Sequence, residues 1–307
     1  MLVDGAAAPW TQARSGRRAA AGGREETQML PVHVGLVSES ASINAAELNR
    51  TAAALQKQVT RDYTPIWNVV ATVSAFTTLN DVPNGYWPVI VMDDIHVSHA
   101  AGVHQDRNGQ PYALVQSGPG WSLTASHEVL EMLTDPFGNR LVSGRSPKPG
   151  QGRVEFLVEV CDPSEDASFA YTANGVTVSD FITPAFYDPV TAASVRYSFT
   201  GAIKAPRTIL KGGYMSWHDP VSDHWWQQIW LGPKAIFRDL GVLGKLEGSL
   251  RAAIDAMTSV PQAQQGLKAR DPRLVAFKPL SDQVDASAGA RADQLRAEIK
   301  ALLAKRD

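Results

Sequence analysis

The sequence predicts an α+β fold, because it contains both strand-like and helix-like segments. Three short apolar runs near the start of the chain are rich in β-branched residues and are typical of strands: 31–39, 67–76 and 87–95. Two other segments repeat apolar residues at helical spacing, 44–59 and 121–136. Further along, Asn174-Gly175 separates two β-rich runs and indicates a hairpin, because both turn positions need positive φ.

The order of these elements can be justified one at a time. In the first helix Asn44 is the expected N-cap with Glu47 at the third helical position, and the apolar face follows as Leu48, Ala52, Leu55 and Val59. The run 87–95 is apolar almost throughout, which is typical of a central strand. A fourth strand is expected over 111–116, and its leading Pro111 favours an edge position because proline cannot donate a backbone hydrogen bond.

The second half of the chain predicts a hairpin and helical part. A long strand is expected from Arg153 to Asp162, with Glu155, Leu157, Glu159 and Cys161 alternating on one face. The segments 246–260 and 287–307 both have helical spacing. We therefore expect three parts: a disordered segment over 1–30, one domain over 31–260, and a linker with an amphipathic helix over 261–307, which is a candidate for self-association.

Composition narrows the classes of function. The 307 residues are 44% hydrophobic and 20% charged, as in ordinary soluble globular proteins. A formal net charge of -2 gives no support for nucleic acid or an anionic membrane as a partner. Cys161 is the single cysteine, so neither an intramolecular disulfide nor a thiolate metal cluster can form. No secretion signal or membrane-spanning stretch is evident, and we expect a cytoplasmic protein.

The second helix, WSLTASHEVLEMLTDP, carries a pattern that indicates metal chemistry. Residues four apart share a helix face with Cβ atoms about 5–6 Å apart, so His127 and Glu131 could hold one ion. Glu128 lies about 100° round the helix, where it could act as a general base toward a water on that ion. The alternative is three polar residues on the wet side of an ordinary helix. The apolar neighbours favour the metal, because burying such groups without partners is costly.

From Pro31 to Pro136 the chain resembles the zincin superfamily of metallopeptidases. Members share a twisted sheet, a backing helix, an edge strand that pairs with extended substrate, and then the active-site helix. The resemblance therefore implies a twisted mixed sheet with a backing helix and an active-site helix for this chain. The motif here is HExxE, with Glu131 where the usual pattern has histidine. The resemblance implies a metal-dependent hydrolase, a peptidase in the first instance, that acts on peptide or protein with zinc as its ion. Two carboxylate ligands also admit another divalent ion, such as manganese.

A zinc site needs at least three protein ligands. The resemblance implies a downstream carboxylate, with Glu159 as the candidate and Asp162 as the close alternative. The competing interpretation makes Glu159 a solvated strand residue and Asp162 a turn former. Asp135 is a candidate to orient His127 by a hydrogen bond, although an Asp before Pro136 is also a common way to end a helix.

Other histidines and tryptophans leave alternatives open. His96, His99 and His104 are expected in an exposed loop, yet His104 is also the candidate to face the cleft and stabilise an oxyanion. Four tryptophans and one tyrosine gather in one stretch: Tyr214, Trp217, Trp225, Trp226 and Trp230. We favour a core role for these rings over a carbohydrate- or peptide-binding platform. The alternative to a peptidase is a non-catalytic zincin-like structural or binding protein, with carbohydrate as a further possible ligand.

Overall fold

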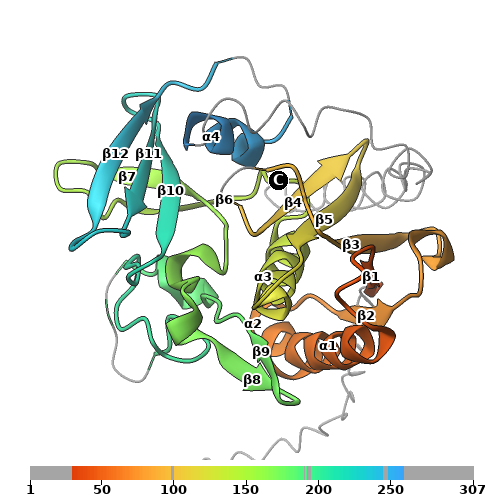
Figure 1. The fold of residues 1–307 in the computed structure, drawn as a ribbon. Helices are drawn as coiled ribbons and strands as arrows, with labels where there is room; N and C mark the ends of the chain where they lie inside the picture. Colours follow the sequence, from red (N-terminus) through yellow and green to blue (C-terminus); the bar gives the residue numbers. More distant parts are fainter. Residues whose placement is uncertain (1–29, 98–99, 190, 192–194, 245–247, 259–307) are drawn as a thin grey trace, which may run out of the picture. The chain divides into compact units, whose positions relative to one another are not determined.

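The computed structural model describes residues 30–97, 100–189, 191, 195–244 and 248–258, and the predicted mixed α+β fold is confirmed there (Figure 1). All of these residues except Leu30 belong to one unit that starts at Pro31. The predicted disordered segment 1–30, apart from Leu30, and the predicted linker and helix of 261–307 lie outside the described residues. None of the described helices is long and apolar enough to cross a membrane.

The first sheet has the order β2-β1-β3-β5-β4. Its strands are β1 (Val32–Ser38), β2 (Ala71–Ala75), β3 (Tyr86–Met92), β4 (Gly102–Arg107) and β5 (Gln110–Gln116). Four of the strands run parallel, and β4 alone is antiparallel to its neighbour β5. The apolar β3 occupies the centre, as predicted. The second strand was predicted over 67–76 but begins only at Ala71, as β2. Trp67 still belongs to the helical turn α2 (Thr64–Trp67), which follows the helical turn η1 (Gln58–Tyr63).

Two helices pack on one face of this sheet. In α1 (Ala45–Lys57) the Asn44 side chain accepts a hydrogen bond from the backbone N–H of Glu47 at 3.0 Å, which confirms the predicted cap. The helix α3 (Trp121–Thr134) is buried on nearly every side. Apolar residues of both helices join one core with Val34, Val89 and Val115. The site helix is therefore fixed firmly by packing rather than exposed on the surface.

The prediction that residues 111–116 form the edge strand is wrong. The edge is β4, whose sequence GVHQDR has no clear apolar alternation and was expected in a loop. Pro111 is tolerated because it pairs with Asp106 of β4 at the start of β5, before β5 begins to pair with β3 at Ala113. The correction matters for function, since β4 also borders α3.

The second sheet is antiparallel throughout and has the order β12-β11-β10-β7-β6. Its strands are β6 (Leu141–Arg145), β7 (Arg153–Leu157), β10 (Tyr214–Asp219), β11 (His224–Ile229) and β12 (Ile236–Gly241). The predicted strand from Arg153 stops at Leu157 instead of reaching Asp162. Beyond it the backbone N–H of Val158 donates to Arg140 O, and the chain enters the short turn η3 (Asp162–Ser164). Glu159 therefore does not continue a strand face with Glu155.

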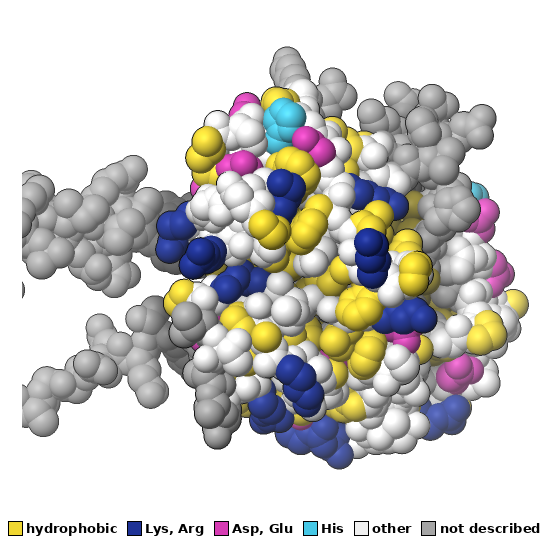
Figure 2. Space-filling view, turned by 90° about the vertical axis from the view of Figure 1, so that its left-hand side faces the viewer, with side chains coloured by type: hydrophobic (Ala, Val, Ile, Leu, Met, Phe, Trp, Pro, Cys, Tyr) yellow, Lys and Arg dark blue, Asp and Glu magenta, His cyan; other side chains and the backbone are white. Residues whose placement is uncertain are grey.

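The tryptophan-rich stretch forms part of this sheet. Trp217 is fully buried against Phe156, and Trp225 is buried as well, while Trp226 and Trp230 are partly buried beside the main core. The structure therefore favours the core interpretation. On the side shown in Figure 2, the described surface mixes Lys and Arg with hydrophobic side chains, and carboxylates gather mainly toward its margins.

The remaining described elements are short. The predicted hairpin is confirmed as β8 (Tyr171–Ala173) and β9 (Val176–Val178), with positive φ at both turn residues, Asn174 and Gly175. Further turns are η2 (Leu79–Asp81), η4 (Ala167–Phe169) and η5 (Pro184–Tyr187). The helix predicted over 246–260 is observed as α4 (Leu250–Thr258). Its Ile254 packs against Leu157 and Trp225 of the second sheet.

Candidate metal centre

The predicted motif lies where α3 approaches the edge strand β4. Glycine at position 102 permits this approach, because a Cβ atom there would lie 2.6 Å from Thr124 Cγ2 and 2.7 Å from Glu128 Oε1. Glu128 and Glu131 are both buried on α3, and His127 retains only a small exposed area. The alternative in which these three residues occupy the wet side of an ordinary helix is therefore wrong.

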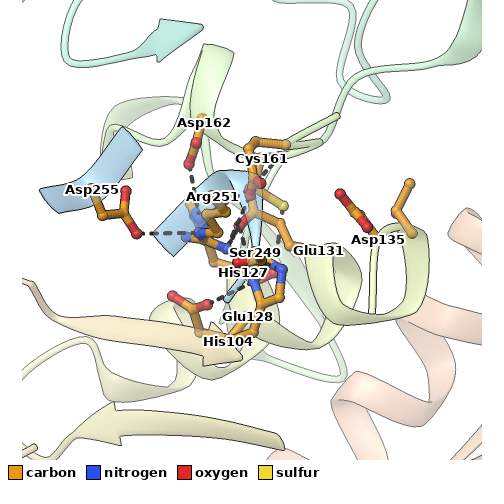
Figure 3. Close-up of polar contacts among 12 residues, drawn as sticks. His104, His127, Glu128, Glu131, Asp135, Cys161, Asp162, Ser249, Arg251 and Asp255 are labelled. Atoms are coloured by element: carbon orange, nitrogen blue, oxygen red, sulfur yellow. Dashed lines mark hydrogen bonds and ion pairs between the residues drawn. The ribbon is translucent and has the colours of Figure 1, made fainter. Parts of the chain in front are cut away.

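One imidazole nitrogen lies between two carboxylates (Figure 3). His127 Nε2 is 3.2 Å from Glu131 Oε1 and 3.2 Å from Asp162 Oδ1. The first contact follows from the i, i+4 spacing on α3, and the second brings in η3 from the other half of the chain. The backbone N–H of Cys161 donates to Glu131 Oε1 at 3.2 Å and fixes the orientation of that carboxylate. His127 Nε2 thus has a carboxylate oxygen on each side, and donor atoms of His127, Asp162 and Glu165 lie within 4.8 Å of one another.

The geometry separates the two candidates for the third carboxylate. Asp162 contacts His127, whereas Glu159 Oε2 lies 3.0 Å from Arg251 Nη1. Asp162 is held in place by a close backbone approach, because a Cβ atom at Gly213 would lie only 2.5 Å from Asp162 O. Glu159 remains a neighbour, since oxygen atoms of Glu131, Glu159 and Asp162 lie within 4.8 Å of one another.

His104 enters the centre from β4. It is 2% exposed, and its Nδ1 lies 3.4 Å from Glu128 Oε2 and 3.6 Å from Glu131 Oε2. The expectation of an exposed loop is wrong for His104, which instead lies buried against two carboxylates of the motif helix. The same expectation holds for His96, which is exposed, and His99 lies outside the described residues.

Arg251 of α4 and Glu165, which follows η3, are site residues that the sequence did not reveal. Arg251 makes the closer contacts. Its Nη1 lies 3.1 Å from Glu131 Oε2 and also contacts the His104 ring. A sequence signal does exist. Arg251 follows Leu250 and precedes Ile254 by three positions, so a helix places this long cation on its buried stripe. An arginine in such a position requires a buried acidic partner.

Asp135 lies apart from the cluster (Figure 3). Its two oxygens accept hydrogen bonds from the backbone N–H groups of Asn139 at 3.0 Å and Arg140 at 2.7 Å. No contact between Asp135 and His127 is found among the described residues. The structure thus assigns Asp135 to the loop that ends α3, and the prediction that it orients His127 is not supported.

The centre holds more buried negative charge than its protein partners balance. Five oxygens accept no hydrogen bond within the described residues: Glu128 Oε2, both of Glu159 and both of Asp162. Arg251 is the one guanidinium among these acids in the described part of the chain, and a buried charge without compensation is costly. The Asp162 oxygens and Glu131 Oε1, beside His127 Nε2, are the carboxylate and imidazole donors that a divalent cation accepts.

The pKa values of the buried carboxylates shift because of burial and of the charges next to them. Burial, reinforced by the charge of Glu131, raises the pKa of Asp162 to about 6. Burial also raises the pKa of Glu159 well above its usual value. Burial opposes the charge on Glu131, but the charges of His127 and Arg251 outweigh it and hold the pKa of Glu131 well below normal.

Two further shifts concern the remaining donors. Burial lowers the pKa of His127, yet the neighbouring Glu131, Cys161 and Asp162 outweigh it and raise that pKa well above normal. Without an ion, a proton on His127 therefore offsets part of the negative charge. Burial raises the pKa of the Cys161 thiol, which disfavours a thiolate ligand.

The structure thus brings together most of the predicted site residues: His104, His127, Glu128, Glu131, Glu159 and Asp162. Comparison of the chain with protein-family models, with curated proteins and with solved structures finds no match. Function is therefore inferred from the geometry and chemistry of the site.

Proposed function

We propose that the protein is a zincin-like, metal-dependent hydrolase that acts on peptide or protein substrates. The observation that carries this proposal is the placement of His127 Nε2 at 3.2 Å from both Glu131 and Asp162, beside buried carboxylate oxygens that lack hydrogen bonds. The antiparallel edge strand β4 next to the motif helix adds support, because the zincin resemblance implies an edge strand before that helix; in this chain β5 lies between β4 and α3 in the sequence.

The residues that would hold the ion are His127, Glu131 and Asp162. One imidazole and two carboxylates carry a formal charge of -2, which suits zinc and also admits manganese or another divalent ion. When bound, the ion supplies Lewis acidity that polarises a carbonyl group and makes a nearby water easier to deprotonate. Glu159 is left to pair with Arg251.

Glu128 is the proton acceptor in this proposal. Its Oε2 accepts no hydrogen bond within the described residues and lies 3.4 Å from His104 Nδ1. The carboxylate can take a proton from the attacking water and return it to the leaving amine. His104 is placed to donate a hydrogen bond to negative charge that develops on the substrate oxygen. The outer edge of β4, which pairs with no described strand, can hold an extended peptide by main-chain hydrogen bonds.

The test combines elemental analysis with one substitution. We expect purified protein to contain about one equivalent of a divalent metal, and Glu128→Gln to retain that metal and the melting temperature. Hydrolysis of a peptide library should fall by roughly 10²–10⁴, the usual contribution of a general base. Glu155→Gln in β7 is the matched control, because Glu155 pairs with His218 outside the centre. Unchanged hydrolysis in Glu128→Gln, or metal-free protein, would refute the proposal.

Burial favours a second candidate, a non-catalytic metal site that stabilises the fold. Glu128, Glu131 and Asp162 are almost fully buried, as ligands of structural sites are. Under this alternative, chelation lowers the melting temperature, but no member of a broad peptide library is hydrolysed by wild-type protein. The Glu128→Gln comparison then has no activity to lose, and this outcome separates the two candidates.

A further inference from the structure

The helix α4 covers the candidate centre, and we propose that it is an autoinhibitory cap held closed by Arg251. A peptide-sized substrate then reaches Glu128 only when α4 is displaced. Figure 1 shows α4 between the second sheet and the strands β4 and β5. The consequence for substrate depends on the proposed function, whereas the opening of α4 can be measured without metal or substrate.

Arg251 is the strongest link between α4 and the centre. Its guanidinium binds Glu131 Oε2 at 3.1 Å and Glu159 Oε2 at 3.0 Å, and it contacts the His104 ring as well. Within α4 itself, Arg251 Nε lies 3.7 Å from Asp255 Oδ2. Strand β4, helix α3 and the segment after β7 therefore all meet at one side chain of α4.

The other attachments of α4 are few. At its start the backbone N–H of Leu250 donates to Asn139 Oδ1 at 2.9 Å, and that of Arg251 donates to Gly138 O at 3.0 Å. Ile254 is its one fully apolar buried side chain, while Met257 in its last turn is 41% exposed. A helix of nine residues is marginal by itself, so α4 depends on these contacts. Detachment of α4 from the rest of the protein should therefore require less free energy than unfolding of either sheet.

The closed arrangement excludes a peptide. A substrate carbonyl must come within roughly 3–3.5 Å of the reacting groups. Glu128, Glu131 and Asp162 are all buried, and Arg251 occupies the space beside the first two. Arg251 binds Oε2 of Glu131, while Oε1 of the same carboxylate faces His127. A divalent ion and Arg251 thus share one carboxylate, so each weakens the binding of the other.

Cys161 provides an internal reporter of opening. It is the single cysteine of the chain, it is fully buried, and its Sγ lies 3.8 Å from His127 O in the wall of the centre. Thiol labelling of metal-free protein in chelator should be at least about 10-fold faster in Arg251→Gln than in wild type. Amide hydrogen exchange in α4 should speed up in the same variant, while exchange in β3 should not change.

Two control variants separate local opening from loss of stability. Met257→Ala changes an exposed side chain near the end of α4 and should label like wild type. Val37→Ala weakens the apolar cluster on the other face of the first sheet, away from α4. If labelling occurs through local opening of α4, then Val37→Ala should leave the rate nearly unchanged.

Three results would overturn the cap. The first is labelling in Arg251→Gln at the wild-type rate, even if α4 amides exchange faster, because α4 would then not cover the centre. The second is equal acceleration in Val37→Ala and Arg251→Gln, which would mean that labelling requires global unfolding. The third is that the backbone amides of α4 exchange at the same rate as those of β3 in every variant, since α4 would then open only with the whole protein. None of these results bears on whether the centre binds metal, so the two proposals fail independently.

Discussion

Two buried polar clusters lie next to each other along α3, and they differ in how their polar atoms are satisfied. In the first, Ser126 Oγ donates to Gln58 Oε1 at 2.7 Å and accepts from the backbone N–H of Ser179 at 2.8 Å. Gln58 Nε2 in turn donates to Ser179 O at 2.9 Å. In the second, which begins at the next residue, His127, several carboxylate oxygens accept no hydrogen bond within the described residues.

The difference shows that burial of polar groups alone does not mark a functional site. The Ser126 cluster is neutral, and each of its donors meets an acceptor, so it joins α3 to its neighbours and needs nothing more. The cluster around His127 is acidic, and several of its carboxylate oxygens accept no hydrogen bond within the described residues, so it takes up protons or a cation to balance its charge. We therefore take orphaned buried charge, rather than the HExxE pattern alone, as the sign of a metal centre.

The largest expected effect comes from removing charge from the incomplete cluster. At a zinc concentration about 1,000 times Kd, the free energy of unfolding of wild type should rise by about 4 kcal/mol, because the ion binds only the folded state. Asp162→Asn should lose this gain and, without metal, should melt at or above the wild-type temperature, since one orphaned charge is gone. Thermal melts with and without zinc measure both effects.

Asp166→Asn is the matched control for that experiment. Asp166 is exposed and caps η4 by accepting from the backbone N–H of Ser168, a role that asparagine also fills. It should keep the full response to zinc. A zinc response of normal size in Asp162→Asn would exclude Asp162 as a ligand.

A smaller, metal-independent effect is expected in the satisfied cluster. Gln58→Leu removes the partner of both Ser126 Oγ and Ser179 O, and leaving buried groups unpaired should lower the free energy of unfolding by about 1–3 kcal/mol. Urea denaturation should give the same loss with and without zinc. If the loss appeared only in the presence of zinc, the two clusters would be one functional unit and the comparison would fail.

The smallest effect concerns pH in the metal-free protein. The pKa of Asp162 is raised to about 6 by burial first and by Glu131, and that of Glu165 to about 8 by burial first and by Asp162, while that of His127 is raised as well. All three bind protons more tightly when folded. The contribution of Asp162 is lost between about pH 4 and pH 6 and that of Glu165 between about pH 4.5 and pH 8, whereas that of His127 is complete below about pH 6.5 and is lost only above it. Glu131 has a lowered pKa, and its contribution stays constant above about pH 4.5.

The melting temperature of metal-free protein should therefore fall between pH 5 and pH 8. Each unit of pKa shift corresponds to about 1.4 kcal/mol, and the coupled groups share this effect, so we expect a fall of a few degrees. Saturating zinc should abolish the fall, because the ion favours the deprotonated ligands. A melting temperature that rises across this interval without metal would contradict the charge assignment.

Local sequence patterns predicted what depends on a few neighbouring residues. The Asn44 cap, the Asn174-Gly175 turn and the shared helix face of His127 and Glu131 all follow from spacing within one element. These features were right because backbone geometry alone fixes them.

The rest of the centre depends on contacts between distant parts of the chain. His104 and Arg251 meet across 147 positions, and β4 shows no apolar alternation that would have indicated a strand. The choice between Glu159 and Asp162 depends on the path of the chain after β7 ends at Leu157, which brings Glu159 to Arg251 and Asp162 to His127. Such tertiary contacts leave no periodic signal in the sequence.

The most direct test of the central claim is anomalous X-ray diffraction at the zinc absorption edge from crystals grown with zinc. We predict one strong peak about 2.0–2.2 Å from His127 Nε2 and from an oxygen each of Glu131 and Asp162. A map with no peak among these three side chains, with His127 still in direct contact with both carboxylates, would contradict the account.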